Sequence, residues 1–141
     1  MTDKVPHFIA NLSNTSALLN ELLEDINWVG FYLMKDDKLV LGPFQGRTAC
    51  IEIAIGRGVC GTAVMRDEVM LVEDVHTFKG HIACDSASRS EIVIPLHADG
   101  MIVGVLDIDS PLVSRFDRQD AQGLTEVAKI VESFWQLNTH A

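Results

Sequence analysis

Apolar residues recur at the three-to-four-residue spacing of an amphipathic helix at both ends of the chain. The first such stretch covers about residues 9–25, with Asn, Ser and Glu between the apolar positions. The second begins at Asp117, where Asp120 gives an acidic variant of the capping pattern, and continues to about Leu137. Its expected buried residues are Leu124, Val127, Ala128, Val131, Phe134 and Trp135. We therefore predict one helix at each end.

Between these helices the pattern is that of short strands rich in branched and aromatic residues. The predicted strands cover residues 29–34, 39–44, 49–55, 69–72, 91–96 and 101–109, and a run of small residues predicts a short helix at 59–66. The polar residues 35–38 predict a turn, and the Asp99-Gly100 pair is a hairpin signal. The first two strands and the last two should each pair antiparallel.

Strict alternation assigns side chains to faces in two of these strands. In the strand at 49–55 the three isoleucines fall on one face, so Cys50 and Glu52 should point away from them. One face of the last strand carries Val103, Val105, Asp107 and Asp109, and the other carries Ile102, Leu106 and Ile108. The two aspartates should therefore share a face beside apolar surface.

This order of elements describes an α+β fold in which an antiparallel β-sheet is flanked by N- and C-terminal helices and a short helix. We expect one domain over residues 1–141, with an ordered core over about residues 9–137. The chain is 48% apolar, enough to bury a core. No apolar run approaches the ~20 residues that span a bilayer.

The net charge of −9 opposes binding to a phosphate backbone, and the 11 Lys and Arg residues are scattered along the chain. We expect neither nucleic acid nor a membrane as a partner. The first residues lack the basic-then-apolar layout of a secretory signal, so the expected compartment is the cytoplasm. In that reducing compartment, three cysteines indicate thiols used for chemistry or buried in the core.

Cys84 stands out because it lies in the polar run GHIACDSASRSE at 80–91, inside a long stretch without a sustained period. A structural cysteine usually occupies an apolar run, whereas a reactive one needs solvent and proton-exchanging neighbours. We therefore interpret Cys84 as a nucleophile. Cys60 precedes small residues at a helix start and is interpreted as mainly structural, while Cys50 beside Glu52 is a candidate resolving thiol.

Three acids are candidates for proton transfer next to this thiol. Two carboxylates close together beside apolar surface resist joint ionisation, so Asp107 or Asp109 could keep its proton near neutrality. Hairpin closure at Asp99-Gly100 brings Glu91 near them. The alternative is that the aspartates mark a strand end that reaches solvent or cap the next loop, and that Glu91 is simply solvated.

Trp28, Gly30 and Tyr32 fall on one strand face, so two rings flank a position without a side chain. Such a notch could grip a small apolar or sulfur-bearing group, with the indole N–H and the phenol O–H as polar handles. The alternative is that one or both rings belong to the core. We expect no metal site, because the cysteines and histidines lack ligand spacing, although His76 and His81 lie near Cys84.

Five segments in order, together with all three cysteines, resemble the free methionine-(R)-sulfoxide reductases, which are single GAF-type domains. The segments are NWVGFY at 27–32, LGPFQG at 41–46, GVCGTA at 58–63, GHIACD at 80–85 and GVLDIDSP at 104–111. Family members usually carry a further helical stretch before the segment that begins here near Ile9. The resemblance covers nearly the whole chain.

The resemblance implies that Cys84 is the catalytic thiol and Cys50 the resolving one, with Cys60 as a secondary resolving thiol. It assigns Glu91, Asp107 and Asp109 to the acidic part of the pocket, and it places Trp28 and Tyr32 around the methyl-sulfoxide group of the substrate.

The implied reaction reduces free L-methionine-(R)-sulfoxide through a Cys84 sulfenic acid and a Cys84–Cys50 disulfide, which thioredoxin reduces. No bound cofactor is expected, and the chain could form a homodimer. The main alternative is a regulatory GAF domain that binds a small molecule and signals. A purely structural or interaction protein is a third option.

Overall fold

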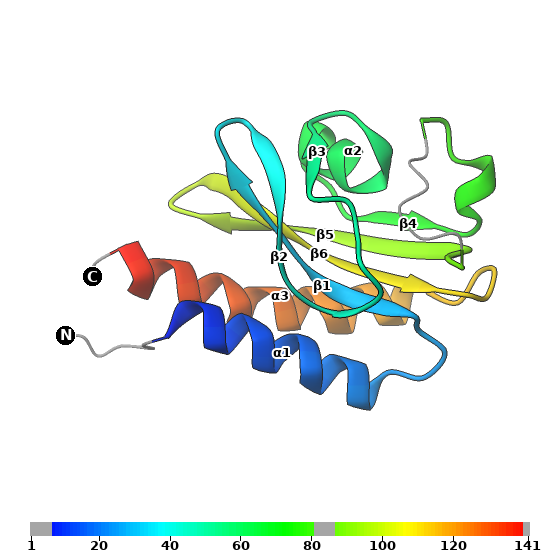
Figure 1. The fold of residues 1–141 in the computed structure, drawn as a ribbon, viewed down its shortest axis with the longest axis horizontal. Coiled ribbons are helices and arrows are strands. Elements are labelled where there is room, and N and C mark those ends of the chain that lie inside the picture. Colours follow the sequence, from blue (N-terminus) through cyan, green and yellow to red (C-terminus); the bar gives the residue numbers. More distant parts are fainter. Residues whose placement is uncertain (1–6, 81–86, 140–141) are drawn as a thin grey trace.

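The computed structural model describes residues 7–80 and 87–139. A six-stranded antiparallel sheet has the strand order β3-β2-β1-β6-β5-β4, and the helices lie on its two faces (Figure 1). The elements are α1 (Phe8–Leu22), β1 (Trp28–Lys35), β2 (Lys38–Gly46), β3 (Glu52–Ala54), α2 (Gly58–Arg66), β4 (Met70–Val72), a 3₁₀ turn (Val75–Thr77), β5 (Ser90–Ala98), β6 (Met101–Ser110) and α3 (Arg118–Thr139). The predicted α+β class is confirmed.

Tight turns close both predicted hairpins. Asp99 and Gly100 have φ angles of 54° and 76°, and Asp36 and Asp37 have φ angles of 53° and 63°. Consecutive left-handed residues form the hairpin turn whose twist matches that of the flanking strands. The sequence turns therefore place β1 against β2 and β5 against β6, as predicted.

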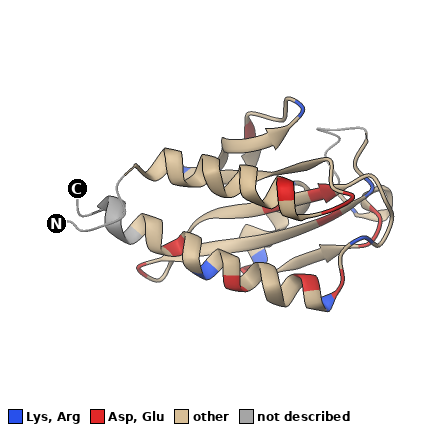
Figure 2. Ribbon diagram, turned by 90° about the horizontal axis from the view of Figure 1, so that it is seen from below, with Lys and Arg blue, Asp and Glu red and all other residues tan. Residues whose placement is uncertain are grey.

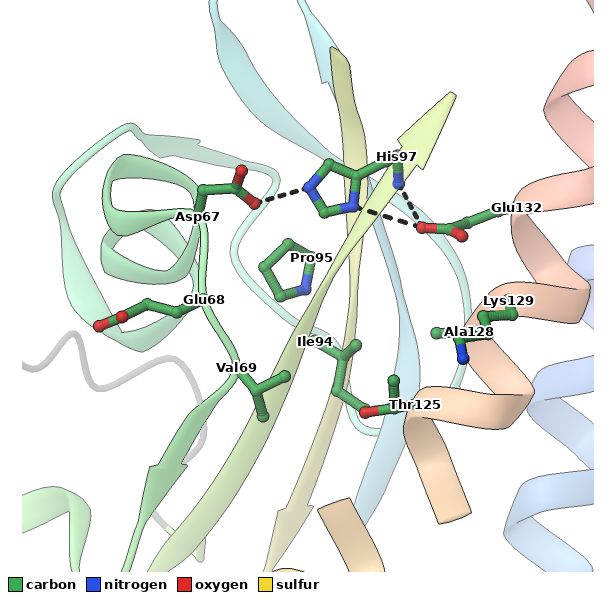
Figure 3. Close-up of a pocket in the computed structure, with 10 residues that line it drawn as sticks. All are labelled: Asp67, Glu68, Val69, Ile94, Pro95, His97, Thr125, Ala128, Lys129 and Glu132. Carbon is green, nitrogen blue, oxygen red and sulfur yellow. Dashed lines mark hydrogen bonds and ion pairs between the residues drawn. The ribbon is translucent and has the colours of Figure 1, made fainter. Parts of the chain in front are cut away.

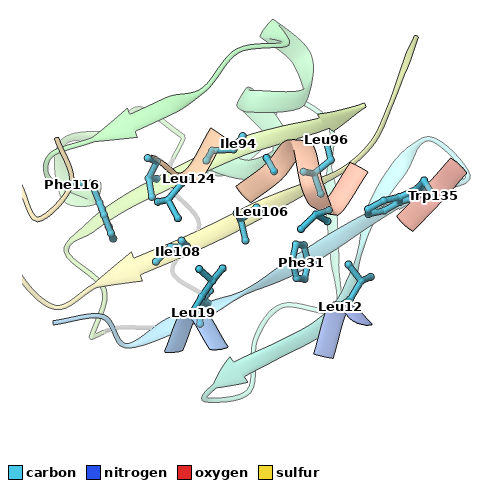
Figure 4. Close-up of a cluster of buried hydrophobic side chains, with 14 of the residues drawn as sticks. Leu12, Leu19, Phe31, Ile94, Leu96, Leu106, Ile108, Phe116, Leu124 and Trp135 are labelled. Carbon is cyan, nitrogen blue, oxygen red and sulfur yellow. The ribbon is translucent and has the colours of Figure 1, made fainter. Parts of the chain in front are cut away.

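Two apolar cores lie on opposite faces of the sheet. The core beneath α1 and α3 contains the predicted side chains of the last helix and the inward residues of β5 and β6 (Figure 4). Its labelled members are Leu12, Leu19, Phe31, Ile94, Leu96, Leu106, Ile108, Phe116, Leu124 and Trp135. The second core lies under α2 and includes Trp28, Tyr32, Val59 and Cys60.

The start of α3 confirms the predicted cap. The backbone N–H of Asp120 donates to Asp117 Oδ1 at 2.9 Å, and the N–H of Asp117 donates to Asp120 Oδ2 at 2.9 Å. This reciprocal pair satisfies two of the donors that a helix start otherwise leaves free.

The alternation predicted for residues 49–55 is wrong. β3 is only three residues long, so Ile53 alone is buried, whereas Ile51 is 70% and Ile55 is 40% exposed. Cys50 precedes the strand, where alternation does not apply, and packs half-buried against the same core as Ile53.

The faces predicted for β6 are right from Val105 onward and wrong before it. Leu96 pairs with Gly104 but His97 pairs with Ile102, so Val103 is an extra residue in β6. A bulge of this kind reverses the faces beyond it. Accordingly Val103 packs toward α1 and α3, and Ile102 toward α2.

Charged residues are distributed unevenly over the helical face. Figure 2 shows Lys and Arg at isolated positions rather than in a stripe, and α1 carries a single acidic position, Glu21, while α3 carries both signs.

In the part of the chain that the structure describes, none of the helices combines the length and apolar character needed to cross a membrane.

A close backbone approach fixes α2 against the sheet. A Cβ on Gly61 would lie 2.4 Å from the carbonyl oxygen of Ala54. We therefore expect Gly61→Ala to lower the free energy of unfolding by about 1–3 kcal/mol, the usual cost of overpacking. Gly123→Ala is the control, because its Cβ would meet open space in α3, and it should stabilise by about 0.5–1 kcal/mol. Urea denaturation of both variants checks the opposite signs.

Candidate active site

The three predicted acids lie together on the sheet face that α2 covers. Glu91 in β5 pairs directly with Asp109 in β6, and Asp107 pairs with Val93, two positions along. Directly opposite residues share a face, and diagonal neighbours remain within reach of long side chains. All three acids are buried, at 9%, 5% and 8% exposed for Glu91, Asp107 and Asp109, so the solvated alternative does not apply.

The aromatic residues lie beside the acids. In the pairing of β1 with β6, Trp28 is opposite Asp109 and Gly30 is opposite Asp107. The sequence could not place these strands next to each other, since they are 66 or more residues apart and connected through four other strands and α2. The site is therefore one continuous face of β5, β6 and β1.

The predicted notch at Gly30 is filled. Trp28 stacks on Tyr32 with ring centroids 5.9 Å apart and on Phe44 with centroids 5.1 Å apart. A Cβ on Gly30 would lie 2.3 Å from Cβ of Phe44, so the space above the glycine belongs to its cross-strand partner. Gripping a substrate between the two rings is therefore wrong; three rings form one stacked wall beside the acids.

Both polar handles of the rings hold the loop that carries Cys50. The indole N–H of Trp28 donates to the carbonyl of Arg47 at 3.1 Å, and the Tyr32 hydroxyl donates to the carbonyl of Cys50 at 2.9 Å. Trp28 and Tyr32 thus hold the backbone at Arg47 and Cys50 beside the aromatic wall. Cys50 is disulfide-bonded, whereas Cys60 is a free, buried thiol.

Cys60 lies closer to the acid cluster than the sequence indicated. Its Sγ is 3.9 Å from Glu91 Oε2, and ligand atoms of Cys60, Glu91 and Asp107 all lie within 4.8 Å of one another. The glycines that flank it in GVCG are the sequence signal for this position, because Gly61 allows α2 to approach the sheet.

Burial dominates the electrostatics of the cluster. Removal from water raises the pKa of Glu91 well above its usual range, and the charges of Asp107 and Asp109 raise it further. Burial also raises the pKa of Asp107, while hydrogen bonds with Glu91, Cys60 and Asp109 pull it back. The pKa values of both acids are thus raised: burial favours a proton on Glu91, and it also disfavours a charge on Asp107, which the hydrogen bonds that Asp107 accepts offset only in part.

The same surroundings keep the neighbouring donors neutral. Burial, followed by the charges of Asp107 and Glu91, raises the pKa of the Cys60 thiol, and burial with nearby acids raises the pKa of Tyr32. Both groups therefore hold their protons at neutral pH.

The cluster has the atoms to hold a cation, but not in its resting protonation state. A thiol and two carboxyl groups form a metal-ligand set only when deprotonated. Since Glu91 and Cys60 hold their protons, a metal would first have to displace them. We derive no metal chemistry from this group.

Cys84 lies outside the described residues. The described residues on either side of it are anchored near the acids: the carbonyl of Gly80 accepts from the N–H of Gly58 at 3.1 Å, and Ser88 Oγ accepts from Asn27 Nδ2 at 3.1 Å. These anchors at the start of α2 and of β1 were not predicted.

A separate pocket of about 270 Å³ lies at the edge of β5, between the α2–β4 connection and α3 (Figure 3). His97 bridges it: its Nε2 is 2.6 Å from Asp67 Oδ1, and its backbone N–H donates to Glu132 Oε2 at 2.6 Å. None of the predicted site residues lines this pocket.

Comparisons with known proteins identify the family and the fold. The GAF domain family matches residues 15–136. The free methionine-R-sulfoxide reductase of Escherichia coli is 62% identical over 125 residues, which cover 89% of this chain and 76% of that protein. The corresponding protein of Saccharomyces cerevisiae is 43% identical, with 93% of this chain and 77% of that protein covered.

Two solved structures of similar sequence also have closely similar three-dimensional structures. The reduced form of fRMsr of Staphylococcus aureus has a TM-score of 0.88 at 58% identity, with 91% of this chain and 83% of that one covered. The free methionine-R-sulfoxide reductase of Neisseria meningitidis, in complex with its substrate, has a TM-score of 0.92 at 48% identity, with 95% and 81% covered.

The fold and the buried site define a GAF-domain oxidoreductase. The identities above extend over nearly the whole domain and include an enzyme solved with its substrate. The chain belongs to the free methionine-(R)-sulfoxide reductase family.

Proposed function

We propose that this chain reduces free L-methionine-(R)-sulfoxide to L-methionine, with Cys84 as the nucleophile. The observation that carries the proposal is the shared face of β5, β6 and β1, where a buried acid that keeps its proton lies beside a wall of aromatic rings. A protonated acid can donate a proton to a sulfoxide oxygen, and a wall of aromatic rings can pack against a methyl group. The substrate named for the Neisseria meningitidis relative has both.

In the proposed first step the Cys84 thiolate attacks the sulfoxide sulfur while Glu91, Asp107 or Asp109 donates a proton to the sulfoxide oxygen. The oxygen ends on Cys84 as a sulfenic acid, so the cysteine sulfur loses two electrons and the methionine sulfur gains them. Methionine then leaves. Glu91 is our choice of donor, since burial and two neighbouring acids hold its proton.

The acids have a second proposed role, in binding the substrate ammonium group. Negative charge near a thiol raises the thiol pKa and reduces the thiolate fraction, so these acids do not activate Cys84 as a nucleophile. Asp107 Oδ1 is buried without a hydrogen-bond partner among the described residues, and an ammonium group would supply one. A carboxylate that requires a free ammonium group would select the free amino acid over a peptide residue.

In the proposed second step the Cys50 thiol condenses with the Cys84 sulfenic acid, releasing water and forming a disulfide. A thioredoxin-type dithiol then reduces this disulfide by exchange and is itself oxidised. The hydrogen bond from Tyr32 to the Cys50 carbonyl and the disulfide-bonded state of Cys50 support this assignment. Cys60 is kept as a secondary resolving thiol, and the cytoplasm as the compartment that supplies the dithiol.

The test is a dithiol-dependent reduction assay with free L-methionine-(R)-sulfoxide. The S epimer and a peptide-bound sulfoxide are the controls, and both should react far more slowly. Failure of the wild-type protein to form methionine from the free R epimer would refute the proposal. Ligand binding without turnover would favour the regulatory alternative.

Cys50→Ser should uncouple the first turnover from the later ones. Without the resolving thiol, one equivalent of methionine forms and Cys84 then stays oxidised, so the thioredoxin-coupled rate should fall by about 10-fold or more. Mass spectrometry of the protein after one turnover should find an added oxygen on the peptide that contains Cys84. An undiminished thioredoxin-coupled steady state would contradict the resolving role.

A further inference from the structure

We propose that the protein dithiol that reduces the Cys50 disulfide docks on the outer edge of β3, where it adds an extended segment of its own to the sheet. The inference rests on the proposed function, which requires such a partner. It names the surface that a thioredoxin-type protein would use and the sulfur, that of Cys50, which this protein would attack.

The disulfide at Cys50 determines which surface the partner must cover. Disulfide exchange requires a sulfur of the partner to bond directly to a sulfur of this disulfide, so the residues around the attacked sulfur lie inside the interface. Cys50 is half-buried and disulfide-bonded, and the next residue, Ile51, is 70% exposed. A protein that reaches Cys50 therefore covers Ile51 and the strand that follows.

That strand has an open edge. β3 begins two residues after Cys50 and, in the described sheet, pairs only with β2. The N–H of Leu41 donates to the carbonyl of Ile51 at 2.9 Å, so Ile51 directs this carbonyl toward β2. Backbone groups alternate in direction along an antiparallel strand, and the N–H and carbonyl of Glu52 therefore face the outer side.

An open edge beside a disulfide fits a partner that carries an extended segment next to its reactive thiol. Such a segment adds to an exposed sheet edge through main-chain hydrogen bonds, and an apolar side chain beside the edge supplies buried contact area. The Glu52 backbone offers the donor and the acceptor, and Ile51 offers the apolar side chain. A small dithiol has no segment to pair and depends on neither residue.

Docking on this edge directs the exchange to Cys50. A thiolate of the partner attacks Sγ of Cys50, the bond between Cys50 and Cys84 breaks, and Cys84 leaves as a thiolate. The second thiol of the partner then attacks the partner's own sulfur in the mixed disulfide and releases Cys50. The partner loses two electrons and two protons and becomes a disulfide, and Cys50 and Cys84 gain them as thiols.

Two substitutions at Glu52 test the hydrogen bond of the edge. Glu52→Pro removes the outward N–H without removing a hydrogen bond to β2, as proline does when it is placed on an edge strand. Glu52→Ala is the matched control, because it keeps this N–H and removes the same ion pair with Lys38. We expect kcat/KM for thioredoxin to be about 5-fold lower in Glu52→Pro than in Glu52→Ala, the effect of one main-chain hydrogen bond.

A substitution at Ile51 tests the apolar contact. Ile51→Asp should lower kcat/KM for thioredoxin by about 10-fold or more, because a charge replaces a buried apolar side chain at the interface. Ile130→Asp is the control, since Ile130 is 64% exposed on α3, and it should leave kcat/KM for thioredoxin unchanged. Wild-type recycling of Ile51→Asp by thioredoxin would overturn the proposal, and so would an equal loss in Ile130→Asp.

Two assays without a protein reductant separate docking from the reaction itself. Recycling by dithiothreitol, a small dithiol, and methionine formed in a single turnover should both be unchanged in Ile51→Asp. An equal loss of recycling with dithiothreitol and with thioredoxin would overturn the docking surface. Failure of the wild type to form methionine in a single turnover would instead refute the proposed function.

A trapped intermediate tests which sulfur is attacked. A thioredoxin whose second cysteine is replaced by serine cannot complete the exchange and stays joined to the enzyme. Peptide mapping of this complex should find the bond on Cys50, and Ile51→Asp should form less of the complex than Ile130→Asp. A bond on Cys84 would overturn the proposed direction of attack.

Discussion

Cys84→Ser is expected to lower the turnover of free L-methionine-(R)-sulfoxide by about 10⁴-fold or more, since removing a catalytic nucleophile can cost up to about 10⁶-fold. A serine hydroxyl is not ionised near neutral pH, and its oxygen cannot accept the sulfoxide oxygen, whereas the cysteine sulfur accepts it and becomes a sulfenic acid. Methionine released in a single turnover, measured by mass spectrometry, gives the chemical step directly and avoids any effect on recycling.

Cys60→Ser is the matched control for this variant, since it removes a sulfur from the same site but should retain turnover. Full turnover by Cys84→Ser would refute the nucleophile assignment, even if the family activity remained. A loss in both variants would mean that the two sulfurs share the chemistry.

Glu91→Gln should stabilise the folded protein at neutral pH while it slows the reaction. The pKa of Glu91 is raised on folding, so the folded state binds a proton that the unfolded state releases above about pH 4.3. The free energy of unfolding of the wild type should therefore fall by about 1.4 kcal/mol per pH unit from that pH up to the folded pKa. Glutamine removes the contribution of Glu91 and leaves that of Asp107, whose pKa is also raised, so the decline should become shallower and the two proteins should differ little at pH 4.

The activity of Glu91→Gln should fall, although its stability at neutral pH should rise. Glutamine has no acid proton to donate, so the single-turnover rate should fall by about 10²-fold or more, the usual contribution of general acid catalysis. Glu52→Gln is the control, because that side chain is 57% exposed and pairs with Lys38 at 2.9 Å. The free energy of unfolding from pH 4 to 8, measured together with the single-turnover rate, should distinguish Glu91→Gln from Glu52→Gln. Equal pH dependence in wild type and Glu91→Gln would contradict a buried, protonated Glu91.

The sequence predicted the acid cluster because its information is local. The pairing of Glu91 with Asp109 depends on the bulge at Val103, since the turn alone would place Glu91 opposite Ile108. The turn and the alternation still supply two steps: Asp99-Gly100 brings the Glu91 end of β5 to the end of β6 that carries the aspartates, and alternation puts Asp107 and Asp109 on one face. These steps depend only on turn geometry and on a period of two.

What could not be predicted depends on contacts between distant segments. The adjacency of β1 to β6 places Trp28 beside Asp109, and the filling of the notch by Phe44 requires the register of β1 and β2. The position of Cys60 beside Glu91 requires the depth to which α2 packs, and the bulge at Val103 reverses a face with no sequence signal. Tertiary packing overrides local pattern in each case.

The hydrogen bond from the N–H of His97 to Glu132 makes the exposed edge of β5 a poor template for edge-to-edge pairing with a strand of another molecule. β4 pairs only with residues 91–93 of β5, so in the described sheet the rest of β5 has no strand beside it on that edge. An unpaired edge can template the addition of a foreign strand and lead to aggregation. Pro95 has no N–H to offer, and the N–H of His97 is already occupied by Glu132. Two residues and one carboxylate from α3 thus close an edge that β4 is too short to cover.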